Sequence, residues 1–534
     1  MLIWRSRSRS IFTAKINLIS CAAEMLRLRG RQISMMFCPA FRRVLILPQA
    51  TPALIFCMKP AFYLLPLAAL LGLPAAVRAQ NELSNFTATG RGGVINTFAQ
   101  DYQAIGINPA NLGRPGEAAV AFTIGEVGAG LASRSLSKTL LKHILFDSNQ
   151  AIGSVEKAEL VKGLEGENAL NINVDATTLG FAISLPNGLG GLAFSNRQRV
   201  GTHLALNHNA ADVIVNGRDA RSIQQYYPTD PATGQPTGAG LPPPLISTFL
   251  DGTSIQLAWT SEYNVSYGVR VLDKVGFKLS AGAGYRYIQG IGIADIQVAN
   301  GNLAAYTALS PVFGVDYGKL VNNPQFNFET GGGLHPVGHG NGYDLGLAAE
   351  IGKVLRVGAS VTDMGSMTWT GNVVTAADQK LQATTSTGIQ TYNVLKELAN
   401  QFDTNKTNLF TYEAAKERIA ALPAKLRLGA GVRISSLFEA GIDFTAPLNK
   451  VAGNLTSPFL GLGVDFKPIN WLRLSSGVSG GAGYGTSLPL GVTIVSPVWE
   501  AGISSRDVLG YFNEKSPYYS VALGFLRFKL GGKS

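Results

Sequence analysis

Cysteine is almost absent from this chain. The 534 residues include three, Cys21, Cys38 and Cys57, and all of them precede residue 58. Residues 58–534 therefore contain no disulfide, no thiol nucleophile and no cysteine ligand for a metal ion. Functions that depend on cysteine chemistry are excluded for this part of the chain.

Excess positive charge is scarce outside the N-terminus, although the formal net charge of the whole chain is +11. Residues 1–57 contribute +8 and residues 58–79 contribute +2, which leaves +1 for residues 80–534. The positive net charge therefore comes from the N-terminus and does not indicate an acidic partner for residues 80–534. We expect no nucleic-acid partner.

Long apolar runs are also missing from the main part of the chain, which has no stretch of 18 apolar residues and so no candidate spanning helix. Near the N-terminus, Lys59 precedes an apolar core at Ala61–Leu73, and Val77–Ala79 resembles a cleavage site. We interpret residues 58–79 as a secretory signal peptide. Residues 1–57 are interpreted as an over-extended gene start, with a genuine cytoplasmic extension as the alternative.

The sequence does contain long alternations of apolar and polar residues. Between Ile255 and Val271, one parity is apolar except for Ser261, and the other carries Glu262 and Arg270 among polar and small residues. Successive side chains of a strand point to opposite faces, so this segment has an apolar and a polar face. Ordinary strands have about 5–6 residues. A strand of a membrane barrel needs about 9–11 to cross the bilayer and can continue beyond it, so the length of this alternation favours a membrane barrel.

The same pattern recurs along the chain, and short turns alternate with long connections. The long connections are 216–253, 294–341 and 365–423, as expected for the outer loops of such a barrel. We therefore predict an all-β fold, a single transmembrane antiparallel β-barrel of about fourteen strands over residues 117–534, with an N-terminal plug segment at 80–116. A few short helices are expected in the loops, at 136–146, 155–164, 395–402 and 412–422.

Charged residues gather on the polar parity and are expected to face the barrel lumen. Charges of both signs can be buried only when they are paired or hydrated. Two interpretations stay open: a salt-bridge network that fills a closed lumen, or a path for solute. Glycine also repeats on this parity, as at Gly268, Gly282 and Gly346, and leaves room for a plug. The lumen-facing candidates are Glu262, Arg270, Lys278, Arg286, Asp344, Glu350, Arg356, Arg427, Arg433 and Asp443.

Motifs for catalysis or metal binding are weak. His335 and His339 are four residues apart, but Pro336 and the flanking glycines prevent the helix that would bring them together at a metal ion. We find neither a Gly-x-Ser-x-Gly elbow with clear partners nor a glycine-rich phosphate loop followed by Lys-Ser or Lys-Thr. We therefore expect no enzyme activity, no cofactor and no metal site.

The segment before the first strand contains Asn108-Pro109-Ala110-Asn111-Leu112 behind a glycine-rich start. One interpretation is an Asn-Pro turn that begins the first strand or a plug. The other is a hatch that gates transport, with Asn108, Pro109, Ala110 and Asn111 as its candidate residues. In this feature the segment resembles the N-terminal hatch of the long-chain fatty-acid transport porin family.

Over roughly residues 80–530, the chain more closely resembles an uncharacterised family of outer-membrane barrels that is loosely similar to the fatty-acid porins. The match rests on Gly190–Ser195, Ser360–Gly365 and Leu422–Gly429. Resemblance to the fatty-acid family implies a fourteen-stranded barrel with an N-terminal plug and passage of hydrophobic ligands.

Two functions are compatible with these observations. The first is a transport or porin-like channel of the outer membrane, for small or hydrophobic solutes, with a hydrophobic small molecule as its ligand. The alternative is a structural or secretion- or assembly-accessory barrel that does not transport and whose outer loops bind a partner. The expected partners in both cases are outer-membrane lipid and the barrel-assembly machinery, whose terminal-strand signal the stretch Ser520–Leu530 loosely fits.

Overall fold

The computed structural model describes residues 85–531, apart from 117, 231–234, 236, 239, 394–410, 456 and 483–484. The expected N-terminal extension (1–57) and signal peptide (58–79) lie outside these residues, as does the helix expected at 395–402. Within the described part of the chain, no helix is both long and apolar enough to span a membrane.

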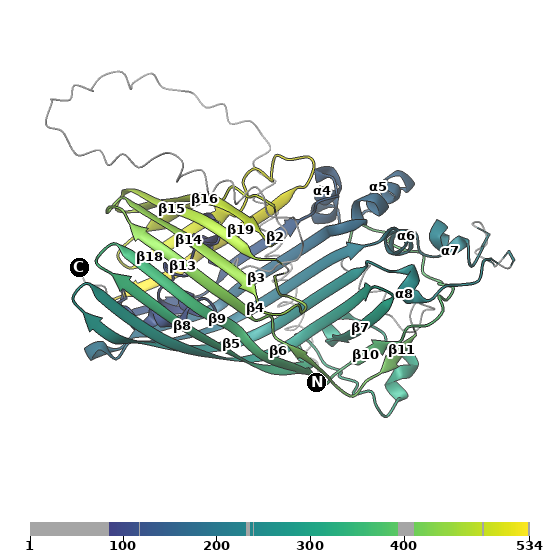
Figure 1. Ribbon diagram of the computed structural model, residues 1–534. Helices are drawn as coiled ribbons and strands as arrows, with labels where there is room; N and C mark the ends of the chain where they lie inside the picture. Colours follow the sequence, from purple (N-terminus) through teal and green to yellow (C-terminus); the bar gives the residue numbers. More distant parts are fainter. Residues whose placement is uncertain are drawn as a thin grey trace, which may run out of the picture. The chain divides into compact units, whose positions relative to one another are not determined.

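One sheet of antiparallel strands closes on itself to form a barrel (Figure 1). Strands β1 and β2 together make the first barrel strand, because both pair with β3 and with the last strand, β19. In the same way, β12 and β13 both pair with β9 and make one barrel strand. The predicted closed barrel of fourteen strands is therefore confirmed. The segments that build it are β1 (Val120–Thr123), β2 (Glu126–Ala132), β3 (Gly166–Ser184), β4 (Gly191–Leu206), β5 (Ser254–Lys274), β6 (Phe277–Ala299), β8 (Gly338–Ile351), β9 (Leu355–Trp369), β12 (Arg418–Ala421), β13 (Lys425–Arg433), β14 (Phe438–Pro447), β15 (Phe459–Ile469), β16 (Leu472–Gly481), β17 (Leu490–Val495), β18 (Trp499–Ser505) and β19 (Tyr518–Leu530).

Three further strands, β7 (Asn302–Leu309), β10 (Val373–Ala376) and β11 (Tyr412–Ala414), extend the sheet outside the ring of barrel strands. Strand β7 pairs with the C-terminal part of β6, β10 pairs with β7, and β11 pairs with β10. The helix predicted for 412–422 is wrong, because this stretch forms β11 and β12. Backbone pairing with β10 and β9 outweighs the local preference for a helix.

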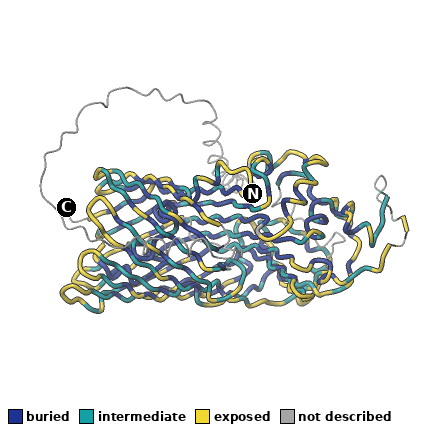
Figure 2. The backbone as a smooth tube through the Cα atoms, turned by 45° about the horizontal axis from the view of Figure 1, so that its top comes forward, coloured by how far each residue is buried: buried dark blue, intermediate teal, exposed yellow. Residues whose placement is uncertain are grey.

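The alternation in the sequence separates the two faces of the barrel wall. Val265 and Tyr267 are 48% and 38% exposed, whereas Glu262, on the opposite parity of the same strand, is 3% exposed. Buried and exposed residues alternate in this way along the strands (Figure 2). The wall thus has apolar side chains outside and polar side chains inside, which is the pattern of a membrane barrel.

The connections differ at the two ends of the barrel. At one end, which we call the short-turn end, tight turns join β3 to β4, β5 to β6, β8 to β9, β13 to β14, β15 to β16 and β17 to β18. The opposite end, the loop end, carries the long connections. Strands β5 and β6 have 21 and 23 residues, whereas β17 and β18 have 6 and 7, so one side of the wall projects further at the loop end (Figure 1).

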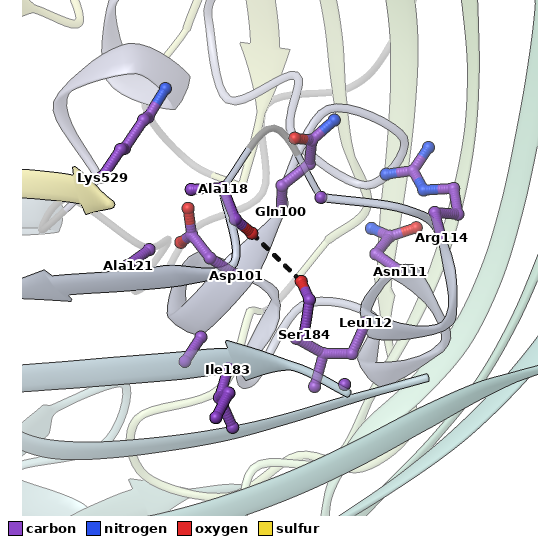
Figure 3. A pocket seen from close by; sticks show the side chains of 13 residues that line it. Gln100, Asp101, Asn111, Leu112, Arg114, Ala118, Ala121, Ile183, Ser184 and Lys529 are labelled. Carbon is purple, nitrogen blue, oxygen red and sulfur yellow. Dashed lines mark hydrogen bonds between the residues drawn. The ribbon is translucent and has the colours of Figure 1, made fainter. Parts of the chain in front are cut away.

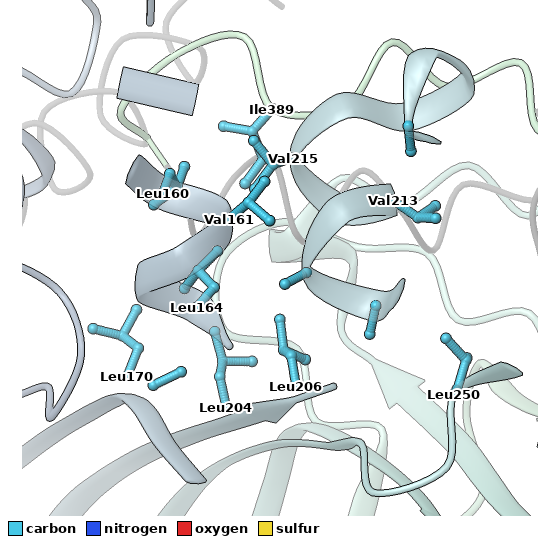
Figure 4. Packing of buried hydrophobic residues seen from close by; sticks show 14 of the residues in the cluster. Leu160, Val161, Leu164, Leu170, Leu204, Leu206, Val213, Val215, Leu250 and Ile389 are labelled. Carbon is cyan, nitrogen blue, oxygen red and sulfur yellow. The ribbon is translucent and has the colours of Figure 1, made fainter. Parts of the chain in front are cut away.

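An apolar cluster under short helices covers the projecting side of the loop end (Figure 4). Leu164 of α5, Leu170 of β3, Leu204 of β4 and Val215 of α6 are fully buried in it. The helices predicted at 136–146 and 155–164 are confirmed as α4 and α5. The helices at this end are α4 (Lys138–Phe146), α5 (Ser154–Leu164), α6 (His208–Asn216), α7 (Arg221–Gln224) and α8 (Ile246–Phe249), with the 3₁₀ turns η4 (Gly217–Asp219), η5 (Pro311–Phe313) and η6 (Gly318–Asn322). The 3₁₀ turn η3 (Pro186–Gly188) joins β3 to β4 at the short-turn end.

Candidate functional site

The candidate site is built around residues 85–116, which we call the N-terminal segment. It contains the helix α3 (Phe86–Gly90) and the 3₁₀ turns η1 (Asp101–Ala104) and η2 (Pro109–Gly113). An asparagine precedes α3 and another precedes η2. The Asn85 Oδ1 atom accepts the N–H of Ala88 at 3.0 Å, and the Asn108 Oδ1 atom accepts the N–H of Ala110 at 3.1 Å. Side-chain caps of this kind begin short helical turns by satisfying donors that have no backbone partner.

A row of glycines receives η2 on the inner face of the wall. Gly191, Gly268, Gly282 and Gly346 lie directly opposite one another on β4, β5, β6 and β8. A Cβ atom on any of them would lie under 3.0 Å from an atom of residues 108–113. The lack of side chains on these four residues therefore leaves the space beside the wall that η2 occupies.

Polar groups of the wall hold the N-terminal segment along its length. The Asp443 Oδ2 atom on β14 accepts the backbone N–H groups of Ile95 and Asn96, both at 2.6 Å. The Asn108 Nδ2 atom donates to the Leu347 carbonyl on β8 at 3.0 Å. A carboxylate that satisfies two buried N–H groups of the segment is a strong anchor, because leaving such donors unpaired is costly.

Ion pairs anchor other parts of the same segment. The Arg91 guanidinium lies 2.7 Å from Asp465 on β15, and Asp101 lies 2.8 Å from Arg527 on β19. The Tyr102 hydroxyl donates to Glu126 on β2, and burial raises the pKa of this phenol well above its usual value. Contacts with β2, β8, β14, β15 and β19 place the segment inside the ring of strands, where it appears in purple in Figure 1.

The C-terminal part of the segment is held by Arg114, which donates to the carbonyls of Thr97 and Ala99 at 2.9 and 3.0 Å. Burial, and after it the charge of Arg356, lower the pKa of this guanidinium to about 10, so that it is still charged at neutral pH. A cavity of about 30 Å³ lies between this part of the segment and strands β1 and β3. Figure 3 shows the side chains that line it, Gln100 among them.

Six charged residues form a network in the barrel interior. The Arg286 guanidinium lies 2.7 Å from Asp344, 2.5 Å from Asp363 and 3.4 Å from Glu262. The Arg199 Nη1 atom lies 3.2 Å from both Glu262 and Asp363. Three bases offset three acids, and all six residues are buried. The members are Arg199, Glu262, Arg286, Asp344, Asp363 and Lys425, whose Nζ atom lies 3.9 Å from Asp363.

The segment touches this network from the short-turn side. A Cβ atom on Gly106 would lie 3.0 Å from the Arg286 Nη2 atom and 3.4 Å from the Arg197 Nη1 atom. Arg197 is itself paired with Asp175. The N-terminal segment and the charged network thus lie next to each other in the barrel interior.

The ten predicted lumen-facing residues are distributed over several levels. Glu262, Arg286 and Asp344 belong to the network, Asp443 binds the N-terminal segment, and Arg427 is buried within 3.4 Å of the Thr362 hydroxyl.

The other five lie towards the short-turn end. Arg270 pairs with Glu350 at 3.0 Å, Lys278 lies 3.8 Å from Asp273, Arg433 pairs with Glu439 at 2.7 Å, and Arg356 lines a second cavity. Contact of these residues with a solute stays a prediction, as does a gating role for Asn108, Pro109, Ala110 and Asn111.

Sequence reasoning missed Arg199 and Asp363 as members of the network. Arg199 shares a parity with the polar residues Ser195 and Arg197, which indicates an inward-facing side chain. The next residue of that parity is Gly201, so the run of polar side chains ends there. Asp363 has a φ of 59°, and the pairing of β8 with β9 is irregular beside it, between Tyr343 and Leu345. Where the alternation of a strand is locally broken, the face on which a residue lies cannot be predicted from the period-two pattern of the sequence.

A family model described as a family of unknown function, DUF5723, matches residues 115–497. This match confirms the expected resemblance to an uncharacterised family. Similar solved structures include the Ralstonia pickettii toluene transporter TbuX, at 13% identity over 85% of this chain and 99% of that chain, with a TM-score of 0.41. The Pseudomonas putida toluene transporter TodX has 10% identity over 85% of this chain and 100% of its own, with a TM-score of 0.38. A Pseudomonas aeruginosa FadL homologue has 10% identity, 85% and 99% coverage and a TM-score of 0.38, and no curated protein matches the sequence.

Proposed function

We propose that this chain, which belongs to the family of unknown function DUF5723, is an outer-membrane channel for small solutes that its N-terminal segment closes. The apolar outer face of the wall supports a place in lipid, since exposed residues such as Val265 and Tyr267 would contact acyl chains. Export through the signal peptide at 58–79 and insertion by the barrel-assembly machinery are part of this proposal.

The observation that carries the proposal is that strands around the ring hold the N-terminal segment against the inner face of the wall. Its residues rest on the glycine row and are bonded to strands around the ring, as described above. Two cavities beside it have volumes of about 30 and 60 Å³, which is room for a few water molecules. A sugar or an aromatic ring cannot pass through spaces of this size, so transport requires the segment to move.

A small hydrophobic solute is the favoured ligand class. The apolar cluster at the loop end, whose residues Leu164, Leu170 and Leu204 are fully buried, gives this end of the barrel an apolar interior beside which such a molecule would enter. The charged network below it is fully paired. A hydrophobic solute would therefore take a route along the segment rather than across the network.

A specific observation also favours the alternative function, a scaffold that does not transport. The three-to-three charge balance of the network and the many anchors of the segment are what a permanently sealed lumen needs. In that case the outer loops would bind a partner.

Locking the segment to the wall separates the two functions. The Thr97 hydroxyl oxygen lies 2.5 Å from the position of a Cβ atom on Gly431 of β13, so cysteines at both positions can form a disulfide. A chain expressed from residue 80 has no native cysteine that could compete. We expect liposomes with the Thr97→Cys, Gly431→Cys variant to take up benzoate, which has an apolar ring and a charge that keeps it from crossing the bilayer unaided, under reducing conditions and to lose this uptake on oxidation.

The reduced variant and the oxidised unsubstituted chain are the matched controls. Equal uptake by the oxidised and reduced variant would show that the segment is not the gate. Absence of uptake by the reduced variant and by the unsubstituted chain would favour the scaffold.

A further inference from the structure

A second cavity, of about 60 Å³, lies between the N-terminal segment and the wall at the short-turn end. The segment contributes Thr87, Phe98 and Gln103 to its lining, and the wall contributes residues of β9, β13, β14, β15, β16 and β19. Arg433 and Lys467 at its edge have side chains that are 48% and 31% exposed, so the cavity is accessible from the short-turn end.

The lining has a strong excess of positive charge. Seven arginine and lysine side chains contribute to it, against the two carboxylates of Glu439 and Asp465. Glu439 is shared by Arg433 at 2.7 Å and Lys467 at 3.3 Å. One carboxylate between two cations leaves an uncompensated positive charge beside the cavity.

The same imbalance recurs deeper in the cavity wall. Arg473, Arg527 and Lys529 all lie within 2.9 Å of the buried carboxylate of Glu500. Arg527 has Asp101 as a second partner at 2.8 Å. Even with Glu500 and Asp101 included, the bases around the cavity outnumber the acids.

Arg356 adds a further positive charge to the lining of the cavity. It lines the cavity from β9, and in the described part of the chain it has no ion pair with any carboxylate. Its charge is felt nearby, because it contributes to lowering the pKa of Arg114. A confined space in which charges of one sign are in excess attracts ions of the opposite sign, because these reduce the repulsion between the like charges.

We propose that this cavity binds a small oxyanion, a phosphate or carboxylate group, between the N-terminal segment and the wall. Guanidinium groups hold such anions by charge-assisted hydrogen bonds, often two from one arginine. Because the lining comes from both the segment and the wall, the anion binds only while the segment is in place. Bound anion therefore stabilises the closed position of the segment by mass action.

The test measures binding of inorganic phosphate to the folded chain in detergent by calorimetry, at constant ionic strength. The variant is Arg356→Gln with Arg433→Gln, which leaves Glu439 paired with Lys467. Loss of two charged donors is expected to weaken phosphate binding at least about tenfold. Arg270→Gln is the matched control, because Arg270 is a base near the same end that pairs with Glu350 and does not line the cavity.

Competition defines the ligand class. Displacement of phosphate by acetate, but not by chloride at the same ionic strength, supports an oxyanion site. The proposal is overturned if the unsubstituted chain binds no phosphate, if chloride displaces it as well as acetate does, or if the double variant binds as tightly as the control. Each variant is expected to fold, because neither substitution leaves a buried acid without a partner. Heat-modifiable migration on gels verifies this.

Discussion

Replacing Arg286 with glutamine is expected to lower the free energy of unfolding of the barrel by about 3–5 kcal/mol. Arg286 lies within hydrogen-bonding distance of Asp344 and Asp363 and 3.4 Å from Glu262. Without it, two bases remain for three buried acids. An uncompensated charge in a buried site costs far more than a surface ion pair contributes, which makes this the largest stability effect that we expect from one substitution.

Urea-induced unfolding from lipid vesicles, followed by tryptophan fluorescence, measures this effect. Lys278→Gln on the same strand is the control, because its side chain is 42% exposed and lies 3.8 Å from Asp273, and its loss should cost less than about 1 kcal/mol. Equal stability of the Arg286 and Lys278 variants would mean that the network is hydrated rather than closed.

Placing a side chain on Gly282 is expected to displace the N-terminal segment and open the channel. In Gly282→Val the new Cβ atom would lie under 3.0 Å from the backbone of Pro109 and Ala110. Strand β6 cannot yield, because it is bonded to β5 on one side and to β8 on the other. The cost of overpacking, about 1–3 kcal/mol, therefore destabilises the closed position of η2, and the open population should rise by about fivefold to 150-fold.

Conductance across a planar bilayer measures this change. The same substitution at Gly332, where a Cβ atom meets nothing within 4 Å, is the control and should leave conductance at the level of the unsubstituted chain. A Gly282 variant that folds but conducts no more than the Gly332 variant would place the closure somewhere other than at η2.

The barrel itself could be predicted from the sequence because its main determinant is local. Alternation from Ile255 to Val271 assigns each side chain to a face without reference to any other strand. The inward placement of Glu262, Arg286 and Asp344 follows from the same parity. The glycines on that parity, such as Gly282, also predicted room for another segment beside the inner face of the wall, and η2 lies there.

What the sequence could not reveal depends on contacts between distant residues. Asp443 was expected to face the lumen, but its two bonds to the backbone of Ile95 and Asn96 join residues more than 300 positions apart. Asp363 lies at an irregular point of β9 and has no periodic signal. The stretch 412–422 has a local pattern suited to a helix, and only its pairing with β10 and β9 makes it extended.

The central claim is that the N-terminal segment closes an otherwise open barrel. Deleting residues 85–114 tests it most directly, because the first strand begins only at Val120 and the strands are bonded to one another without the segment. Single-channel recordings of the full chain should show a closed pore with rare openings, and the deleted chain should conduct continuously. A folded, deleted barrel that stays as closed as the full chain would contradict the account.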